Sequence, residues 1–181
     1  MEDGLRRKHT LKNKSLLFNP APTDQAHMAA GRYHVTGGSS LEIISGIDGK
    51  TKKAFDAPDS LQIIETSWIG TDVYATAVSD NGYGIYRFPL DRNLESTGGW
   101  ETVLSPQPVM IKDLSVWKNE LIFTCDRTGV NELYHLDPST GSLTQKTSTR
   151  YGASDFQYSE DGRWLYYSSQ TMKGKHIMRT P

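Results

Sequence analysis

Short apolar segments separated by polar, glycine-containing turns follow one another along most of the chain. VYATAV from Val73, LIFTC from Leu121 and WLYY from Trp164 are apolar at consecutive positions, which is typical of a strand covered on both faces. Segments such as LTQKT are more polar and alternate, as expected of a strand with one face in water. No long segment has the period of a helix, although residues 22–30, PTDQAHMAA, could form a short capped helical turn. The pattern therefore predicts an all-β fold.

The strands recur as a repeat. Four segments end in a hydroxyl residue, and these residues lie 40, 48 and 44 residues apart: Thr36, Thr76, Thr124 and Ser168. Each is followed by a polar turn and a second strand, and most repeats also contain an earlier strand and a fourth one. Four antiparallel strands joined by tight turns form the blade of a β-propeller, whose repeat is about 40–50 residues long. A single blade has no core of its own, so the blades must pack against one another around an axis.

The repeat also predicts how the chain is organised. A basic N-terminal arm with a partial strand is expected at residues 1–30. About four blades are expected to follow it, at residues 31–60, 61–105, 110–150 and 153–181. Because four blades rarely close a ring, and six to eight are commoner, we expect these blades to be part of a larger propeller. As an alternative, the segment KSLLF at 14–18 supplies a missing strand and closes a small ring.

Composition and charge exclude several classes of protein. The 181 residues include 20 Lys and Arg and 21 Asp and Glu, and this near-neutral balance provides no basic surface for nucleic acid. The one cysteine, Cys125, ends an apolar strand, so we expect a buried, unreactive thiol and no intrachain disulfide. The apolar run at 16–18 is too short for a signal peptide, and no segment approaches the ~18 apolar residues of a spanning helix. We therefore expect no signal sequence within these residues and no membrane contact.

Two motifs in the last third of the chain are specific enough to indicate a family. DPSTG at 137–141 is followed by LT, and SEDGRWL at 159–165 opens the next repeat. Residues 133–169 around them resemble the TolB-like (WD-repeat-like) propeller repeat, in which a blade ends in DPxTG and the next begins with SPDGKxL. Here Glu160 stands in place of the usual proline and Arg163 in place of lysine. The resemblance implies a propeller fold and two settings: surface or periplasmic proteins of Bacteroides-like bacteria, and the propellers of dipeptidyl peptidase IV and prolyl oligopeptidase relatives.

The sequence contains no catalytic constellation. The GxSxG motif of a serine hydrolase is absent, and the Gly-Gly-Ser-Ser segment at 37–40 fits a hairpin turn better than a nucleophile elbow. His34, His135 and His176 fall on expected strands of different repeats but at different distances from the axis, so they do not predict a metal site. No loop has the oxygen-rich spacing of a calcium site. The sequence predicts no catalytic residue, metal or cofactor, and favours a chain that is not itself an enzyme.

Four residues are candidates for a binding surface. Arg150 and Tyr151 precede an expected innermost strand, at a blade entrance where propellers often display contact residues. Trp68 and Trp117 end two earlier innermost strands. Together they could form an aromatic binding face, although packing between blades explains each of them about as well.

These observations favour a non-enzymatic propeller scaffold that binds a protein, peptide or glycan. The family resemblance places it in an extracytoplasmic bacterial protein, periplasmic or on the cell surface, with a cytoplasmic location as the alternative. Two other functions stay open: a gating propeller of a serine peptidase whose catalytic domain lies outside this chain, and an enzyme that uses channel residues, such as a polysaccharide lyase. Because an open propeller exposes the faces of its end blades, a homo-oligomer that completes the ring is a further hypothesis.

Overall fold

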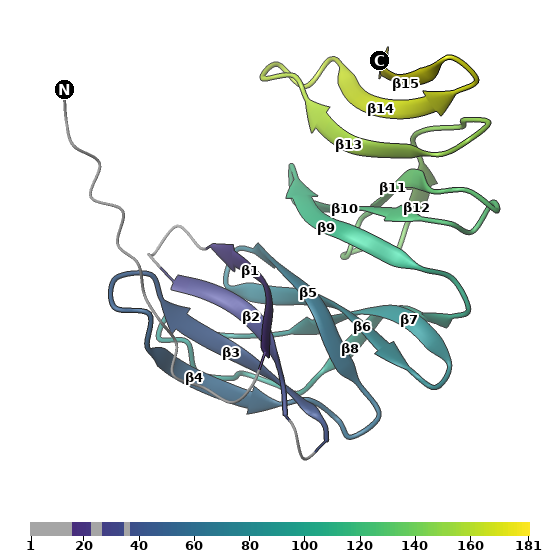
Figure 1. Cartoon of the computed structure of the whole chain (residues 1–181). Helices are drawn as coiled ribbons and strands as arrows, with labels where there is room; N and C mark the ends of the chain where they lie inside the picture. The colour runs from purple at the N-terminus through teal and green to yellow at the C-terminus, as the bar shows by residue number, and fades with distance from the viewer. Residues whose placement is uncertain (1–15, 23–26, 35–36) are drawn as a thin grey trace.

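The computed structural model describes residues 16–22, 27–34 and 37–181, and these contain 15 strands and no helix. The strands form four antiparallel sheets that follow one another along an open arc from the N-terminal to the C-terminal part of the chain (Figure 1). Within this described part, no helix is available that could cross a membrane. The predicted all-β fold of propeller blades is confirmed.

Each sheet is one blade, and its strands are neighbours in the order in which they occur in the chain. Blade 1 consists of β1 (Leu16–Pro22), β2 (His27–Tyr33), β3 (Ser39–Ser45) and β4 (Thr51–Asp56), and blade 2 of β5 (Gln62–Ile69), β6 (Asp72–Ser79), β7 (Gly82–Phe88) and β8 (Glu101–Gln107). Blade 3 consists of β9 (Ile111–Trp117), β10 (Glu120–Cys125), β11 (Glu132–Leu136) and β12 (Leu143–Gln145), and blade 4 of β13 (Ala153–Tyr158), β14 (Leu165–Thr171) and β15 (Gly174–Thr180).

The blades have two ends that carry different loops. At one end of each blade, here called the crossover end, the first strand begins. The loops between consecutive blades lie at this end, at residues 57–61, 108–110 and 146–152. The turns between second and third strands lie there as well, and their described residues are 37–38, 80–81, 126–131 and 172–173. At the opposite end, here called the hairpin end, each first strand turns into the second. Hydrogen bonds join the crossover ends of consecutive blades: Ser39 Oγ to the Leu61 carbonyl (2.8 Å), Arg127 to Gln107 Oε1 (2.6 Å), and the Ala153 N–H to the Asn131 carbonyl (2.7 Å).

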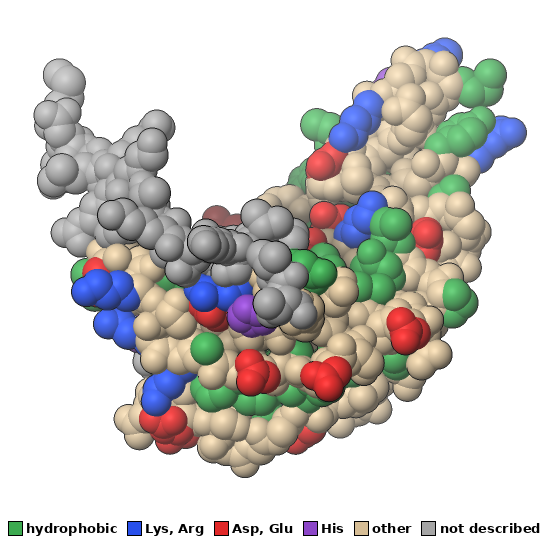
Figure 2. Space-filling model, turned by 60° about the horizontal axis from the view of Figure 1, so that its bottom comes forward, with side chains coloured by type: hydrophobic (Ala, Val, Ile, Leu, Met, Phe, Trp, Pro, Cys, Tyr) green, Lys and Arg blue, Asp and Glu red, His purple; other side chains and the backbone are tan. Residues whose placement is uncertain are grey.

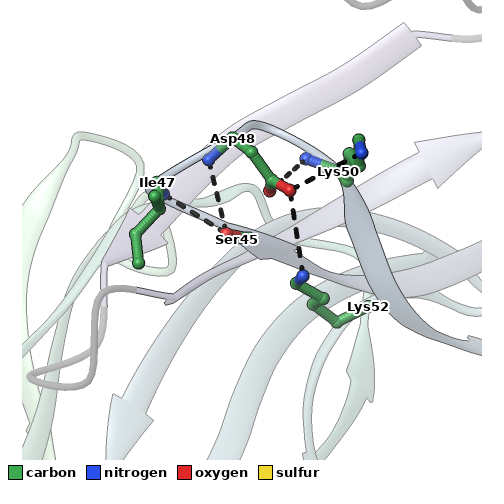
Figure 3. Close-up of polar contacts among 5 residues, drawn as sticks. All are labelled: Ser45, Ile47, Asp48, Lys50 and Lys52. Atoms are coloured by element: carbon green, nitrogen blue, oxygen red, sulfur yellow. Dashed lines mark hydrogen bonds and ion pairs between the residues drawn. The ribbon is translucent and has the colours of Figure 1, made fainter.

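The turn between β3 and β4 shows how short polar sequences close these hairpins. The Ser45 hydroxyl oxygen accepts hydrogen bonds from the backbone N–H groups of Ile47 and Asp48, at 3.3 and 3.4 Å (Figure 3). The Asp48 carboxylate in turn accepts the N–H of Lys50 (3.2 Å) and lies 3.9 Å from the ammonium groups of Lys50 and Lys52. These side chains satisfy turn backbone groups that the ladder leaves without partners.

Apolar side chains fill the three interfaces between blades. The central strands β6 and β10 are buried over most of their length, as their sequences predict, because each has a blade on both sides. Strand β14 is partly exposed, since only blade 3 covers it. Fully or nearly fully buried residues at the interfaces include Leu41, Ile43, Ile63 and Val73 between blades 1 and 2, Ile85, Ile111, Leu121 and Phe123 between blades 2 and 3, and Ile122, Leu133 and Leu165 between blades 3 and 4.

The prediction of a helical turn at residues 22–30 is wrong. Pro22 ends β1, residues 23–26 lie outside the described part, and β2 begins at His27. Ala29 and Ala30 are both fully buried, so they fill the two faces of a covered strand. Blade 1 therefore starts at Leu16 and not at residue 31. Of the segment KSLLF, residues 16–18 pair with β2, so they complete blade 1 and do not close a ring.

The repeat assignment is right in three blades and wrong in the first. Thr76, Thr124 and Ser168 pair with Ile85, Leu133 and Ile177, respectively, on the third strand of their blades. In blade 1 the residue with this pairing is Gly31, opposite Leu41, whereas Thr36 lies outside the described residues. A Cβ at Gly31 would approach the Cγ2 atom of Ile63 to 2.6 Å, so close contact with blade 2 requires glycine here.

Candidate functional site

The four residues predicted to form one binding face lie at opposite ends of the blades. Trp68 and Trp117 are at the hairpin end, near the ends of β5 and β9. Arg150 and Tyr151 are in the loop between β12 and β13, at the crossover end. The structure thus brings together Arg150 with Tyr151 but does not bring either of them to the tryptophans. A ligand role for these residues stays a prediction.

Both tryptophans pack against neighbouring blades. Trp117 stacks on Tyr158 of blade 4, with ring centroids 4.6 Å apart and planes inclined by 11°, and the Lys118 ammonium lies 5.5 Å from its ring centre. Trp68 packs against the apolar cluster between blades 1 and 2. Stacked aromatic pairs contribute to packing beyond their buried area. The packing explanation that the sequence left open therefore accounts for the contacts of both residues.

Arg150 and Tyr151 form a stacked pair on a loop that the protein holds in place. The Arg150 guanidinium lies 5.3 Å from the centre of the Tyr151 ring, and Tyr151 is 45% exposed. The anchor is Glu132, a carboxylate that is 1% exposed and accepts hydrogen bonds from the Thr147 hydroxyl and from the hydroxyl (2.8 Å) and N–H of Thr149. A buried carboxylate is tolerated only with such partners, so the loop conformation and the burial of Glu132 depend on each other.

Exposed apolar side chains recur at the crossover end. Met110 (37% exposed) and Tyr151 (45%) lie in the loops before β9 and β13, Tyr33 (38%) ends β2, and Met172 (88%) lies in the turn between β14 and β15. Single exposed apolar residues are ordinary on a protein surface. Their recurrence at one end, beside an arginine stacked on tyrosine, matches the composition of protein-binding surfaces, where Tyr, Met and Arg are enriched.

The hairpin end has a groove of about 960 Å³ between blades 2 and 3. Its central charge is Arg87, whose guanidinium donates to Asp72 (2.8 Å) and Glu101 (2.7 Å), and these bonds, that to Asp72 first, raise the pKa of Arg87. At the rim, hydrogen bonds from Ser139 and Thr140 lower the pKa of Asp137 to about 2. These charges already have partners within the chain. The groove is assembled from turns of two blades, so no sequence motif predicts it.

A second, smaller groove of about 290 Å³ lies between blades 3 and 4. It contains a chain of hydrogen bonds in which Glu120 contacts Nδ1 of His135 (2.5 Å) and the Tyr158 hydroxyl contacts Nε2 (2.5 Å). Burial lowers the pKa of His135, and burial raises the pKa of Tyr158 to about 12. Both groups are therefore uncharged near neutral pH. The chain of bonds connects the third strand of blade 3 to the first strand of blade 4.

The described residues contain no group of three or more His, Cys, Asp and Glu side chains placed to hold a metal ion. His34 and His135 do not converge on one point: His34 bonds Ser40 (3.0 Å) in blade 1 and His135 lies between blades 3 and 4. Cys125 is buried, as predicted, and burial raises the pKa of its thiol.

Comparisons with known proteins bear on the fold. No family model matches the sequence, and no curated protein matches it. Solved structures do match: TolB from Acinetobacter baumannii has 17% identity and a TM-score of 0.67 over 94% of this chain and 42% of that one. The Dos1 propeller has 13% identity and a TM-score of 0.62 over 94% and 47%, and a puromycin-hydrolyzing peptidase from Mycobacterium tuberculosis has 13% and 0.66 over 96% and 28%.

The chain thus spans less than half the length of each of these three structures. At such low identities the likeness concerns the fold and not the activity. Propellers of TolB and of peptidases are both among the similar structures, as the resemblance of residues 133–169 implies. The four blades are therefore a β-propeller scaffold of TolB-like architecture.

Proposed function

We propose that this scaffold is a non-catalytic binding module whose ligand is a protein or peptide segment, held at the crossover end. The observation that carries the proposal is the Arg150–Tyr151 pair, which is exposed, stacked at 5.3 Å and fixed through Glu132. Arginine and tyrosine supply a large share of binding energy at protein interfaces. A loop that is already ordered loses less conformational entropy when a ligand binds.

The methionines at the same end favour a polypeptide over a glycan as the ligand. Met110 and Met172 are exposed, flexible and polarizable, and such side chains adapt to varied apolar partners. The family resemblance supports a setting in an extracytoplasmic bacterial protein, periplasmic or on the cell surface. Glycan binding is the alternative, and screening peptides and glycans separately distinguishes the two ligand classes.

The experiment is a screen of the labelled protein on a peptide array and a glycan array, followed by titration of the strongest ligand. Arg150→Ala and Tyr151→Ala are each expected to weaken binding by at least about tenfold, which corresponds to ~1.4 kcal/mol. Arg163→Ala is the matched control, because Arg163 is an exposed arginine in the turn between β13 and β14, at the hairpin end. A ligand found only among glycans would reassign the ligand class, and equal weakening by all three variants would refute the site.

A second function is favoured by one observation. Several similar structures are the propellers of peptidases, including the peptidase from M. tuberculosis. In this alternative the four blades form part of a gate over a separate hydrolase domain. The complete reading frame decides it: a domain with a GxSxG motif encoded beside these blades would support the gate, and an unrelated neighbour or none would remove it.

A further inference from the structure

The crossover end carries two neighbouring pairs of an exposed arginine and an exposed apolar side chain. In the first pair, the Met110 N–H donates to Asp126 Oδ1 (2.7 Å), which brings Met110 next to the turn that carries Arg127. In the second pair, Arg150 stacks on Tyr151. Figure 2 shows hydrophobic and basic side chains next to one another on the arm at the upper right, where blade 4 continues from blade 3.

The two pairs lie on one continuous surface. The Ala153 N–H donates to the Asn131 carbonyl (2.7 Å), and this bond joins the turn that carries Arg127 to the loop that carries Arg150. Arg127 lies four residues before Asn131, and Arg150 lies three residues before Ala153. An extended segment of fewer than about ten residues, at ~3.3 Å each, is therefore long enough to reach both arginines. Asn131 itself is exposed, and an amide side chain can donate to and accept from a peptide backbone.

Neither arginine has a carboxylate partner within the described part of the chain. The Arg127 guanidinium donates to the neutral Gln107 Oε1 (2.6 Å), and that of Arg150 lies over an aromatic ring. The carboxylates nearby are already bound: Asp126 accepts a backbone N–H, and the buried Glu132 accepts hydrogen bonds from two threonines. A ligand that covers this surface must therefore supply the groups that pair with the arginines.

Positive charge is confined to one side of the crossover end. Its loops and turns between residues 108 and 152 contain three basic residues and one acidic residue: Arg127, Lys146, Arg150 and Asp126. The described loops and turns of blades 1 and 2 contain Asp59 and Asp80 and no basic residue. At the start of β9, Lys112 and Asp113 cancel each other's charge. An acidic segment is therefore attracted to the side formed by blade 3 and the loop after it, and repelled from blades 1 and 2.

We propose, resting on the binding function proposed above, that the peptide held at the crossover end is acidic and has carboxylate side chains interspersed with apolar ones. The carboxylates bind Arg127 and Arg150, and the apolar side chains cover Met110 and Tyr151. Arginine presents its donors as a planar fork that matches a carboxylate, and such charge-assisted bonds are stronger than neutral ones. The alternation of charge and apolar surface selects a segment that is both acidic and apolar over one that is only acidic.

The test uses an array of synthetic ten-residue peptides of varied sequence. Each acidic peptide is printed beside an amide copy, in which asparagine and glutamine replace aspartate and glutamate. The strongest acidic ligand is expected to bind at least about tenfold more tightly than its amide copy in solution titration. Its affinity should also fall as salt is raised from about 0.05 to 0.5 M, whereas the affinity of the amide copy should change little.

Two variants with the same change of charge locate the effect. Arg127→Gln should weaken the acidic peptide by at least about tenfold and leave the amide copy unchanged, because the copy has no carboxylate for this arginine to bind. Arg92→Gln is the matched control, since Arg92 is an exposed arginine in the loop between β7 and β8, and it should leave both peptides unchanged. Circular dichroism checks that each variant is folded.

The outcomes separate this proposal from the function on which it rests. Amide copies that bind as tightly as the acidic peptides, still dependent on Arg150 and Tyr151, would overturn the acidic ligand and leave the peptide-binding site intact. Equal weakening by Arg92→Gln and Arg127→Gln would also overturn it, because the attraction would then come from total charge. An array without any bound peptide, or binding restricted to glycans, would overturn both the acidic ligand and the peptide-binding function.

Discussion

Two threonines at equivalent positions of blades 2 and 3 should respond in opposite ways when their hydroxyl groups are removed. Thr76 and Thr124 are 0% and 2% exposed. The Thr124 hydroxyl lies 2.8 Å from a carboxylate oxygen of Asp113 and 3.3 Å from the carbonyl of Lys112. The Thr76 hydroxyl has no hydrogen-bond partner within the described structure. The residue opposite it, Glu65, directs its carboxylate to the backbone N–H of Leu114 (2.9 Å) in the next blade.

The magnitudes follow from this difference. A buried hydroxyl without a partner costs about 1–3 kcal/mol, so Thr76→Val, which replaces it with a methyl group of similar shape, should stabilise the protein by about 1–2 kcal/mol. Thr124→Val loses a hydrogen bond to a carboxylate; because Asp113 is exposed and can bind water instead, the expected loss is about 1 kcal/mol. For a protein of this size, each kcal/mol corresponds to a change of about 2–4 °C in Tm.

Urea unfolding of the two variants and the wild type measures both changes. The midpoints should move in opposite directions with unchanged slopes, since the surface exposed on unfolding is the same. Any gain from burying a methyl group adds to both variants and cancels in the difference between their free energies of unfolding, which is expected to be about 2–3 kcal/mol. If the two substitutions change the free energy of unfolding equally, the inference that the two positions differ in hydrogen bonding is refuted.

Two further predictions concern packing and pH. Gly31→Ala should destabilise the protein by about 1–3 kcal/mol, because the new Cβ would approach the Cγ2 atom of Ile63 to 2.6 Å. At the control position Gly99 a Cβ would meet no atom within 4 Å, so Gly99→Ala should change the free energy of unfolding by less than about 1 kcal/mol. Chemical unfolding of both variants measures these changes. The free energy of unfolding should fall as pH drops below 6.5, because unfolded His135 binds a proton more readily than the folded residue, whose pKa burial lowers. It should also fall as pH rises above 10, because the folded pKa of Tyr158 is raised to about 12 and the unfolded tyrosine ionises first. His135→Gln should flatten the acid side and Tyr158→Phe the alkaline side; pH profiles that neither variant alters would contradict the assignment.

The sequence predicted strands and blades well where the turn between second and third strands is short or clearly marked. It failed in blade 1, where the sequence aligned Thr36, which lies outside the described residues, with the hydroxyl residues of the other repeats. The true equivalent, Gly31, is set by the approach of Ile63 from the next blade, and contact between residues distant in sequence leaves no mark in the local pattern. Blade 4 shows the opposite case, because its strands have the expected sequence although one of its faces is uncovered.

The candidate site was predictable only where one loop forms it. Arg150 and Tyr151 are neighbours in sequence and lie before a first strand, so their position at a blade entrance could be inferred. Trp68 and Trp117 end strands in the same manner, but whether they face a ligand or another blade depends on the stacking partner, and Tyr158 lies 41 residues after Trp117. Grooves assembled from the turns of two blades are likewise determined by packing and not by spacing.

The two ends of the blades differ in what a ligand would have to displace. At the hairpin end Arg87 is bound to Asp72 and Glu101, and Glu120 is bound to His135, so a polar ligand there must replace charge-assisted hydrogen bonds that already exist. Replacing them costs desolvation and gives little net affinity. At the crossover end a ligand covers apolar and aromatic surface, with Tyr151 at 45% exposure, and displaces only water. Removing such surface from water is favourable by roughly 25 cal/mol per Å². The groove of about 960 Å³ at the hairpin end is therefore the weaker candidate for a ligand site, because the charged groups that line it already satisfy one another.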